Sequence, residues 1–327
     1  MRRALLISSL ILLLPIVVSA QALNSTDAFT ASIDPQYPAP NSQAVVSAVS
    51  STLDLNTATM VVLVMGKEIY RGNVQPVAVP LGGTGKTVKV TITMLTGGTQ
   101  YNQSLSIQPQ DVTLVAEPIS SAPPLYLGKP LVPTGGDVRV VALANLKDNN
   151  GRALNPKSLS YAWSVDGMQI TRGSGIGQQA LVVASPLQYR SRSVSVSVMS
   201  PDGSMVGGAT LSLTPNESLV RIYENDPLLG IRFEHALSGN YAIKDVEDTL
   251  FAAPFSLATT GGVPFIEWFL NGSSAQVGAG ITLRPNGKGE GSASLSLVAS
   301  AGESSRATTD LSLIFGATSG GFSFFGL

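Results

Sequence analysis

The fold is decided by a five-residue motif that occurs three times, as Val62-Leu-Val-Met-Gly66, Trp163-Ser-Val-Asp-Gly167 and Trp268-Phe-Leu-Asn-Gly272. Successive side chains of a strand point to opposite faces, so the first residue of each copy is predicted to lie in a core: Val62, Trp163 and Trp268. The Asp-Gly and Asn-Gly pairs tolerate the positive φ of a tight turn, which places hairpin turns at Gly66, Gly167 and Gly272. A second glycine follows six residues later in every copy, at Gly72, Gly173 and Gly278. A motif that recurs after about a hundred residues indicates tandem domains.

A second pattern follows each motif and predicts the closing hairpin of a sandwich. Apolar residues alternate with hydroxyl residues in 87–93, 193–198 and 292–297. Glycine-containing turns then lead into further alternating strands at 103–107, 209–213 and 309–313. Short strands joined in this way are typical of Greek-key sandwiches, and a buried Trp is typical of immunoglobulin-type domains. We therefore predict an all-β protein of three tandem immunoglobulin-like β-sandwich domains after an N-terminal signal peptide.

The repeats also set the domain boundaries, because the openings of the second and third repeats match, with a Pro-Leu-Tyr-Leu-Gly128 segment in one and Pro-Leu-Leu-Gly230 in the other. The expected order is a signal peptide (1–22), Ig-like domain 1 (23–110), Ig-like domain 2 (111–216), Ig-like domain 3 (217–315) and an aromatic C-terminal tail (316–327). The linkers, near 109–111 and 215–217, are two or three residues long, so little freedom between domains is expected. Only residues 243–250 approach a helical pattern, and a segment this short is predicted to form a loop with at most one helical turn.

The N-terminus predicts export. Arg2 and Arg3 precede an apolar run from Ala4 to Val18, and small residues that suit signal peptidase follow, with cleavage after Ala20 or Ala22. The run is shorter than the ~20 apolar residues of a membrane span, and no later stretch reaches that length. We therefore expect cleavage and an extracellular or cell-envelope location. Retention of the segment as an N-terminal anchor is the alternative.

Composition limits how the protein is stabilised and what it binds. The chain has no cysteine, so an exported form has neither disulfides nor a lipid-modified cysteine and depends on buried cores. Charged residues make up 13% of the chain. Removal of Arg2 and Arg3 from the 20 basic residues leaves 18 against 21 acidic ones, a net charge of −3. No basic cluster indicates nucleic-acid binding.

Three stretches resemble known sequences: Asp34-Pro-Gln-Tyr-Pro-Ala-Pro-Asn41, Ser158-Leu-Ser-Tyr-Ala-Trp-Ser-Val-Asp-Gly167 and Tyr223-Glu-Asn-Asp-Pro-Leu-Leu-Gly230. Through them the chain resembles a family of uncharacterised exported multi-domain proteins of candidate-phyla bacteria. The aromatic-x-x-Asp/Asn-Gly hairpin is similar to that of polycystic-kidney-disease-type immunoglobulin-like domains. The resemblance covers nearly all of the mature chain and implies architecture without catalytic residues. Val62 departs from the aromatic position, and no copy has the full Trp-x-Phe-Gly-Asp-Gly signature.

Two features suggest chemistry that their context does not support. Gly82-Gly-Thr-Gly-Lys-Thr87 ends like a phosphate-binding loop, but Pro80 stands where the first glycine belongs and a strand is expected to follow. His235 is the only histidine, so a Ser-His-Asp triad with Asp245 or Asp248, or a zinc site without thiolates, would depend on it alone. We therefore expect no catalytic residues and no enzyme.

Calcium is the one cofactor that the sequence suggests. Glu224-Asn-Asp226 precedes Pro227 near the start of the third repeat, as acidic residues do at the junctions of cadherin-type repeats. A second acidic loop, Asp148-Asn-Asn150, has too few ligands by itself, and so does the first. Glu224 and Asp226 are therefore candidate calcium ligands, against the alternative of a turn that begins a strand.

The tail is unusually apolar for a chain terminus. Phe322, Phe324, Phe325 and Leu327 follow a Gly- and Ser-containing stretch. Two interpretations stay open: the tail docks on the third domain of its own chain, or a partner captures these four residues, for instance by strand addition.

Export, tandem sandwiches and the lack of a catalytic set favour a non-enzymatic structural or adhesive protein of the cell surface. Its partner would be another protein or a second copy, bound through loops, sheet faces or the tail. A carbohydrate-binding protein is the first alternative, and it needs exposed tyrosines from among Tyr37, Tyr70, Tyr101, Tyr126 and Tyr189. An accessory component of a pilus or secretion apparatus is the second, with the tail as its only indication.

Overall fold

The computed structural model describes residues 28–316 except 149, 244–245, 287–288 and 303–304. The predicted signal peptide and residues 317–327 of the tail lie outside this range. The chain forms two compact units. Of the described residues, the first comprises 28–34, 44–79 and 88–107, and the second comprises 35–43, 80–87 and those from 108 to 316. Within the described residues, no helix combines the length and the apolar character needed to cross a membrane.

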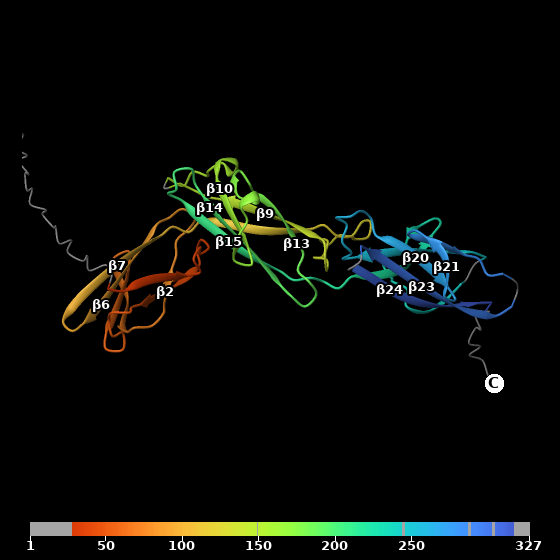
Figure 1. Cartoon of the computed structure of the whole chain (residues 1–327), viewed down its shortest axis with the longest axis horizontal. Coiled ribbons are helices and arrows are strands. Elements are labelled where there is room, and N and C mark those ends of the chain that lie inside the picture. The colour runs from red at the N-terminus through yellow and green to blue at the C-terminus, as the bar shows by residue number, and fades with distance from the viewer. Residues whose placement is uncertain (1–27, 149, 244–245, 287–288, 303–304, 317–327) are drawn as a thin grey trace, which may run out of the picture. The chain divides into compact units, whose positions relative to one another are not determined.

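The strands form six sheets, which follow one another along the chain as three pairs (Figure 1). We call them the N-terminal (30–107), middle (111–213) and C-terminal (219–315) sheet pairs. The N-terminal pair has the strand orders β1-β2-β5 and β4-β3-β6-β7. Its strands are β1 (Thr30–Asp34), β2 (Gln43–Val49), β3 (Thr59–Val64), β4 (Lys67–Asn73), β5 (Val77–Pro80), β6 (Val88–Thr96) and β7 (Thr99–Ile107).

The middle pair consists of a three-stranded sheet, β13-β9-β8, and a sheet with the order β11-β10-β14-β15, in which β12 also pairs with β10. Two single-turn 3-10 helices lie in its loops, η2 (Pro156–Ser158) and η3 (Thr171–Gly173). Its strands are β8 (Asp111–Pro118), β9 (Asp137–Asn145), β10 (Ser160–Val165), β11 (Met168–Gln169), β12 (Gly175–Ile176), β13 (Ala180–Ala184), β14 (Arg192–Met199) and β15 (Val206–Leu213).

The C-terminal pair has the strand orders β17-β16-β19-β22 and β18-β24-β23-β20-β21. The segment predicted as a loop with at most one helical turn, 243–250, contains no helix among its described residues, and its last three residues begin β19 at Asp248. The strands are β16 (Leu219–Asp226), β17 (Gly230–Ile231), β18 (Gly239–Ala242), β19 (Asp248–Phe255), β20 (Phe265–Leu270), β21 (Ser273–Val277), β22 (Gly280–Leu283), β23 (Gly291–Ala301) and β24 (Ser305–Phe315).

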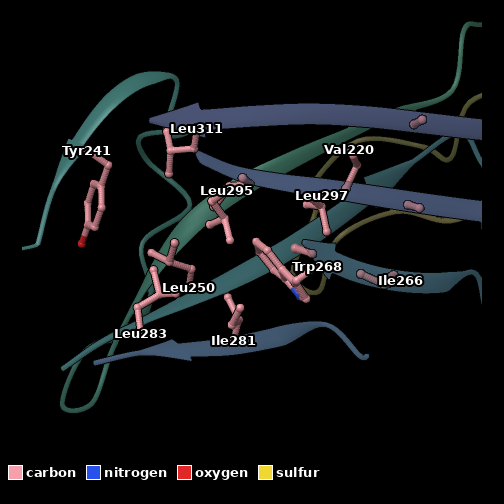
Figure 2. Close-up of a cluster of buried hydrophobic side chains, with 14 of the residues drawn as sticks. Val220, Tyr241, Leu250, Ile266, Trp268, Ile281, Leu283, Leu295, Leu297 and Leu311 are labelled. Carbon is pink, nitrogen blue, oxygen red and sulfur yellow. The ribbon is translucent and has the colours of Figure 1, made fainter. Parts of the chain in front are cut away.

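Alternating apolar residues build a core between the two sheets of the C-terminal pair. Figure 2 shows Trp268 in the middle of this cluster, with Leu250 and Ile281 from one sheet and Leu295 and Leu297 from the other. Trp268 is completely buried, and its indole N–H donates to the carbonyl of Gly278 at 2.9 Å. A buried Trp needs such a partner for its N–H, so the ring fills the core without an unsatisfied donor.

The repeated motif adopts one backbone structure in all three pairs. Val62, Trp163 and Trp268 are each fully buried on β3, β10 and β20. The residue before each turn glycine and the glycine itself both have positive φ, as a type I′ turn requires. The pairs of φ values are 51° and 81° at Met65-Gly66, 51° and 81° at Asp166-Gly167, and 50° and 80° at Asn271-Gly272.

The second glycine of each copy has no common role. Gly72 lies within β4, Gly173 belongs to η3, and Gly278 follows β21 with a φ of 116°. Only at Gly278 does the backbone conformation itself favour glycine. The constant spacing therefore reflects no shared turn, and the strands after the first turn differ in length: β4 has seven residues, β11 two and β21 five.

An aromatic pocket as the candidate binding site

The candidate site begins with the long connection between β8 and β9, residues 119–136, which we call the junction loop. It is fixed to the C-terminal sheet pair by backbone hydrogen bonds. Ser121 N–H donates to Leu257 C=O at 2.7 Å, and Ser256 N–H donates back to Ser121 C=O at 3.0 Å. The Ser121 hydroxyl accepts from Leu257 N–H at 3.1 Å, and Ser120 and Ala258 form a further bridge. The middle and C-terminal sheet pairs accordingly belong to one compact unit.

Two residues at this junction have contacts or backbone conformations that restrict substitution. Gly136 has a φ of 109°, and a Cβ atom there would lie 2.6 Å from the Ala258 Cβ. Ser256 has a φ of 57° and is 1% exposed, and its hydroxyl lies 3.3 Å from the carbonyls of both Val132 and Asn216. A non-glycine residue such as Ser256 keeps a positive φ only where its surroundings hold it. The junction loop is therefore a positioned element rather than a loose connection.

Beyond these hydrogen bonds the junction loop forms one wall of an apolar pocket of about 340 Å³. Residues 123–128 of the loop face Tyr223, Phe233 and Phe255, and none of these nine lining residues is charged. A cavity of this size accommodates one ring or one large apolar side chain with part of its backbone, and pockets of this kind often form between domains. We call it the aromatic pocket.

The aromatic rings of the pocket pack edge to face. The ring centroids of Tyr126 and Phe255 are 5.8 Å apart at 86°, and those of Tyr223 and Phe233 are 5.2 Å apart at 66°. Phe233 also meets Phe251 at 6.3 Å and 88°. Edge-to-face pairs add about 0.5–1.5 kcal/mol beyond area burial, so the rings are held in place before any ligand arrives.

The loop sequence explains how Tyr126 reaches this position. Tyr126 N–H donates to Pro123 C=O at 3.2 Å, which closes a turn, and Leu125 within the turn has a φ of 61°. The Tyr126 ring lies over Gly128, where a Cβ would be 2.6 Å from the ring carbon Cζ. Leu125 and Leu127 project outward, and Tyr126 keeps 45% of its surface exposed. The rim of the pocket is thus apolar and accessible.

Charged groups flank the pocket next to Phe233 but are paired with each other. Arg232 forms an ion pair with Glu234, and this hydrogen bond lowers the pKa of the Glu234 carboxyl and raises that of the guanidinium. His235 is exposed, and its backbone N–H donates to Arg232 C=O at 3.4 Å. Asp248, considered as its triad partner, accepts from the Tyr241 hydroxyl at 3.1 Å, and Asp245 lies outside the described residues. The aromatic pocket can therefore hold an apolar group, and none of its lining residues is charged.

The predicted calcium ligands lie in the turn between β16 and β17. The Asp226 carboxylate accepts the backbone N–H groups of Leu228 and Leu229 at 2.8 and 2.9 Å, and these bonds lower its pKa. Glu224 contributes its backbone carbonyl to Arg232 N–H at 2.8 Å. In the described part of the chain no three His, Asp or Glu residues gather as a metal site would need. Calcium binding at Glu224 and Asp226 stays a prediction, to be tested by melting with calcium and with chelator.

The other predicted sites fall in different places. Phe322, Phe324, Phe325 and Leu327 lie outside the described residues. The phosphate-loop-like segment 82–87 leads directly into β6. Among the five tyrosines considered for sugar binding, Tyr126 and Tyr189 are exposed, and Tyr37, Tyr70 and Tyr101 are half-buried.

Comparison with known proteins assigns the chain to no family. No protein-family model and no curated protein matches its sequence, so neither a polycystic-kidney-disease domain nor any other family is assigned from sequence. Distant structural similarity extends to tandem arrays of immunoglobulin-like and fibronectin-III domains.

Two of these structures can be compared over most of the chain. The central fibronectin-III array of RIM-binding protein has a TM-score of 0.26 and 9% identity over 87% of this chain and 95% of that one. The three N-terminal domains of the bacteriophage RB49 highly immunogenic outer capsid protein have a TM-score of 0.24 and 12% identity over 88% and 99%.

Sequence reasoning missed the aromatic pocket. It aligned the Pro-Leu-Tyr-Leu-Gly128 segment with Pro-Leu-Leu-Gly230 as equivalent openings of two repeats, but the first is a pocket wall and the second is the β16–β17 turn. The available signal was the apolar run Pro123-Pro-Leu-Tyr-Leu127, whose two prolines argue for a connection rather than a strand. Connections are normally polar and cross the surface, so five consecutive apolar residues there indicate a contact.

Proposed function

We propose that this chain is a non-enzymatic protein, exported to the cell surface or envelope, whose three immunoglobulin-like domains present a binding site for another protein. The aromatic pocket is that site, and it takes an aromatic or similarly apolar side chain of the partner. We infer a structural or adhesive role, because an uncharged, mainly apolar pocket suits binding rather than catalysis.

The observation that carries the proposal is the combination of a fixed loop with an uncharged aromatic lining. The junction loop is held by Ser121 and Gly136, so binding does not pay to order it. Aromatic residues in a desolvated pocket are the usual centres of protein-binding energy. Leu125 and Leu127, which are 91% and 104% exposed, supply further apolar contact beside the pocket.

A peptide of residues 317–327 is a suitable probe, because it contains Phe322, Phe324, Phe325 and Leu327. The receptor is the mature chain with the three phenylalanines changed to serine, so that its own tail does not compete. Fluorescence anisotropy of the labelled peptide should show saturable binding. Tyr126→Ala should weaken it by about tenfold or more, as truncation of an aromatic hot spot does.

Tyr189→Ala is the matched control, since Tyr189 is 94% exposed on another loop of the same sheet pair. It should leave peptide binding unchanged. Equal loss in both variants, no binding of the aromatic peptide, or equal binding of a peptide in which prolines replace the phenylalanines, would contradict the proposal.

Carbohydrate binding is the second candidate, because the exposed face of Tyr126 beside an apolar pocket also suits stacking on a sugar ring. The same variants distinguish it. Binding of a neutral oligosaccharide panel that Tyr126→Ala abolishes, without binding of the aromatic peptide, would replace the protein-binding proposal with this one.

A further inference from the structure

The edge strand β13 of the middle sheet pair is a second surface with binding capacity. It borders the three-stranded sheet β13-β9-β8, whose strands β9 and β13 are labelled in Figure 1. All five of its residues, Ala180-Leu-Val-Val-Ala184, are uncharged and apolar. Natural sheets usually protect an edge with charged residues, prolines or very short strands, because an open edge pairs with other chains.

Other edges of the molecule carry such protection. The edge strand β4 contains Lys67, Glu68 and Arg71, the last two joined in an ion pair. The opposite edge of the same three-stranded sheet, β8, contains Glu117 and ends in Pro118. β13 has neither device. The edge strands β15, β21 and β22 also lack charged residues and proline, but each contains Ser, Thr or Gln, whereas β13 is apolar throughout.

The hydrogen bonds to β9 show which groups of β13 point outward. Gln179 C=O accepts from Ala142 N–H at 2.8 Å, and Ser185 N–H donates to Gly136 C=O at 2.8 Å. In an antiparallel ladder, residues bonded to one neighbour alternate with residues directed away from it. Ala180, Val182 and Ala184 therefore direct their backbone N–H and C=O groups to the open side.

These three residues make the strand self-complementary. Val182 is the centre, with Leu181 and Val183 on either side, both buried toward the core, and Ala180 and Ala184 beyond them. A twofold interface needs a surface that matches itself. Antiparallel pairing of β13 with the same strand of a second copy would set Val182 against Val182 and each Ala180 against an Ala184.

The neighbouring charges and turns are compatible with this pairing. Arg139 lies opposite Val182 on β9 and is paired with Glu117 on β8. In the pair of copies the two Arg139 residues would be three strand spacings apart, roughly 14 Å, beyond the screening length at ordinary salt. Arg192 donates to Ala184 C=O at 2.8 Å and leaves the second lone pair of this oxygen for pairing. η3 approaches the strand at the Leu181 side chain, which points inward.

We propose that two copies of this chain associate by antiparallel pairing of their β13 strands about Val182, which joins two three-stranded sheets into one of six strands. Pro186 stands two residues after the end of the strand and limits the pairing to its five residues. The contact is short, so the dimer forms and dissociates with concentration.

Sedimentation velocity of the mature chain over a concentration series should show a monomer–dimer equilibrium. Val182→Lys should raise the dimer dissociation constant by more than about tenfold, because it sets two like charges against each other. Leu143→Lys is the matched control: Leu143 is 56% exposed, Val182 is 55% exposed, and Leu143 lies on β9 rather than at the edge. It should leave the dimer intact. A chain that stays monomeric throughout, or equal dissociation by both variants, overturns the proposal.

A cross-linking experiment tests the same pairing by position, because the chain contains no cysteine. Val182→Cys should give a dimer with a short bismaleimide, since paired residues of two strands lie ~5 Å apart. Leu143→Cys should give none above the level expected from random collision. Cross-linking of both variants alike would show an association through the sheet face and would overturn the edge pairing.

Discussion

The N-terminal and C-terminal sheet pairs build the same hairpin from different side chains. In the C-terminal pair, Trp268 fills the core and its indole N–H is bonded to Gly278. In the N-terminal pair, Val62 occupies the same place, and Met60 and Met94, buried and opposite each other on β3 and β6, fill the remaining volume. Methionine adapts to irregular space, so two of them serve where one rigid ring serves elsewhere.

The turns differ in the same sense. The Asn271 side-chain oxygen accepts from Ser294 N–H at 2.9 Å, whereas at the equivalent place the Met65 sulfur lies 3.3 Å from Lys89 N. The backbone bond of the turn is the same in both: Asn271 N–H to Ser294 C=O and Met65 N–H to Lys89 C=O. A two-residue turn and one backbone hydrogen bond therefore specify the hairpin, and the tryptophan and asparagine stabilise it further.

Truncation of the core residue should show the largest difference in stability between the two sheet pairs. Trp268→Ala should destabilise the C-terminal pair by about 3–5 kcal/mol, because it leaves a large cavity and removes the partner of Gly278 C=O, whereas Val62→Ala should cost the N-terminal pair about 2 kcal/mol. Hydrogen exchange of amides in β20 and β3 measures each pair separately. The destabilisation of the C-terminal pair by Trp268→Phe should be smaller than that by Trp268→Ala. Equal losses in both pairs would mean that the tryptophan has no special weight.

The junction loop should support the C-terminal pair in addition to that pair's own core. Gly136→Ala should cost about 1–3 kcal/mol more than Gly151→Ala, because a Cβ at Gly136 strikes Ala258 whereas a Cβ at Gly151 meets open space. Both glycines have positive φ, so backbone strain is common to the two variants. Faster exchange of the Ser121 and Leu257 amides in Gly136→Ala alone would locate the effect at the junction loop. Equal costs would show that the junction adds nothing to stability.

The hairpins could be predicted from sequence because their signals are local. Alternation places Val62, Trp163 and Trp268 inward, and Asn271-Gly272 favours its turn within two residues. The aromatic pocket could not be predicted, because Tyr126 meets Phe255 only after Ser121 and Leu257 have paired. Nothing in either segment alone encodes that register.

The comparison of the two openings failed for a similar physical reason. Asp226 caps the turn that follows β16 with two backbone bonds, and this fixes Pro227-Leu-Leu-Gly230 as a tight connection. No acidic residue precedes Pro123-Pro124. The similar apolar residues of the junction loop therefore form no capped turn of this kind and extend outward. The residue before the proline distinguishes the two segments. The similarity of the apolar residues that follow concealed this difference in the sequence.

The turn residues allow a smaller and opposite test. Met65→Asn should stabilise the N-terminal pair by about 0.5–1.5 kcal/mol, because it supplies an acceptor for Lys89 N–H and suits a φ of 51° better than methionine. Asn271→Met should cost the C-terminal pair a similar amount. Urea unfolding monitored by hydrogen exchange in β3 and β20 measures both. Met65→Leu, which adds no acceptor, should change little, and a stabilisation of the same size by Met65→Leu would refute the role of the side-chain oxygen.

The smallest expected effect lies in the closing hairpin of the middle pair, where Asp202 lies in the turn at the place that Gly97-Gly98 occupies in the N-terminal pair. Hydrogen bonds from the Ser200 hydroxyl first, and then from the hydroxyl and N–H of Ser204, lower the pKa of Asp202 to about 2. An unfolded chain titrates Asp near 3.9, so the carboxylate stabilises the folded turn above about pH 4, and this contribution is lost as pH falls toward about 2.

The stability difference between the wild type and Asp202→Asn should therefore be greatest at neutral pH and shrink between about pH 4 and pH 2. Melting curves across this range measure the difference, and an NMR titration of the Asp202 carboxyl carbon measures the pKa directly. The side chain is exposed and solvent screens it, so the change should be modest. A carboxyl that titrates at the usual value for Asp would mean that the serine hydroxyls face water in solution, and that Asp202 adds nothing to the stability of this turn.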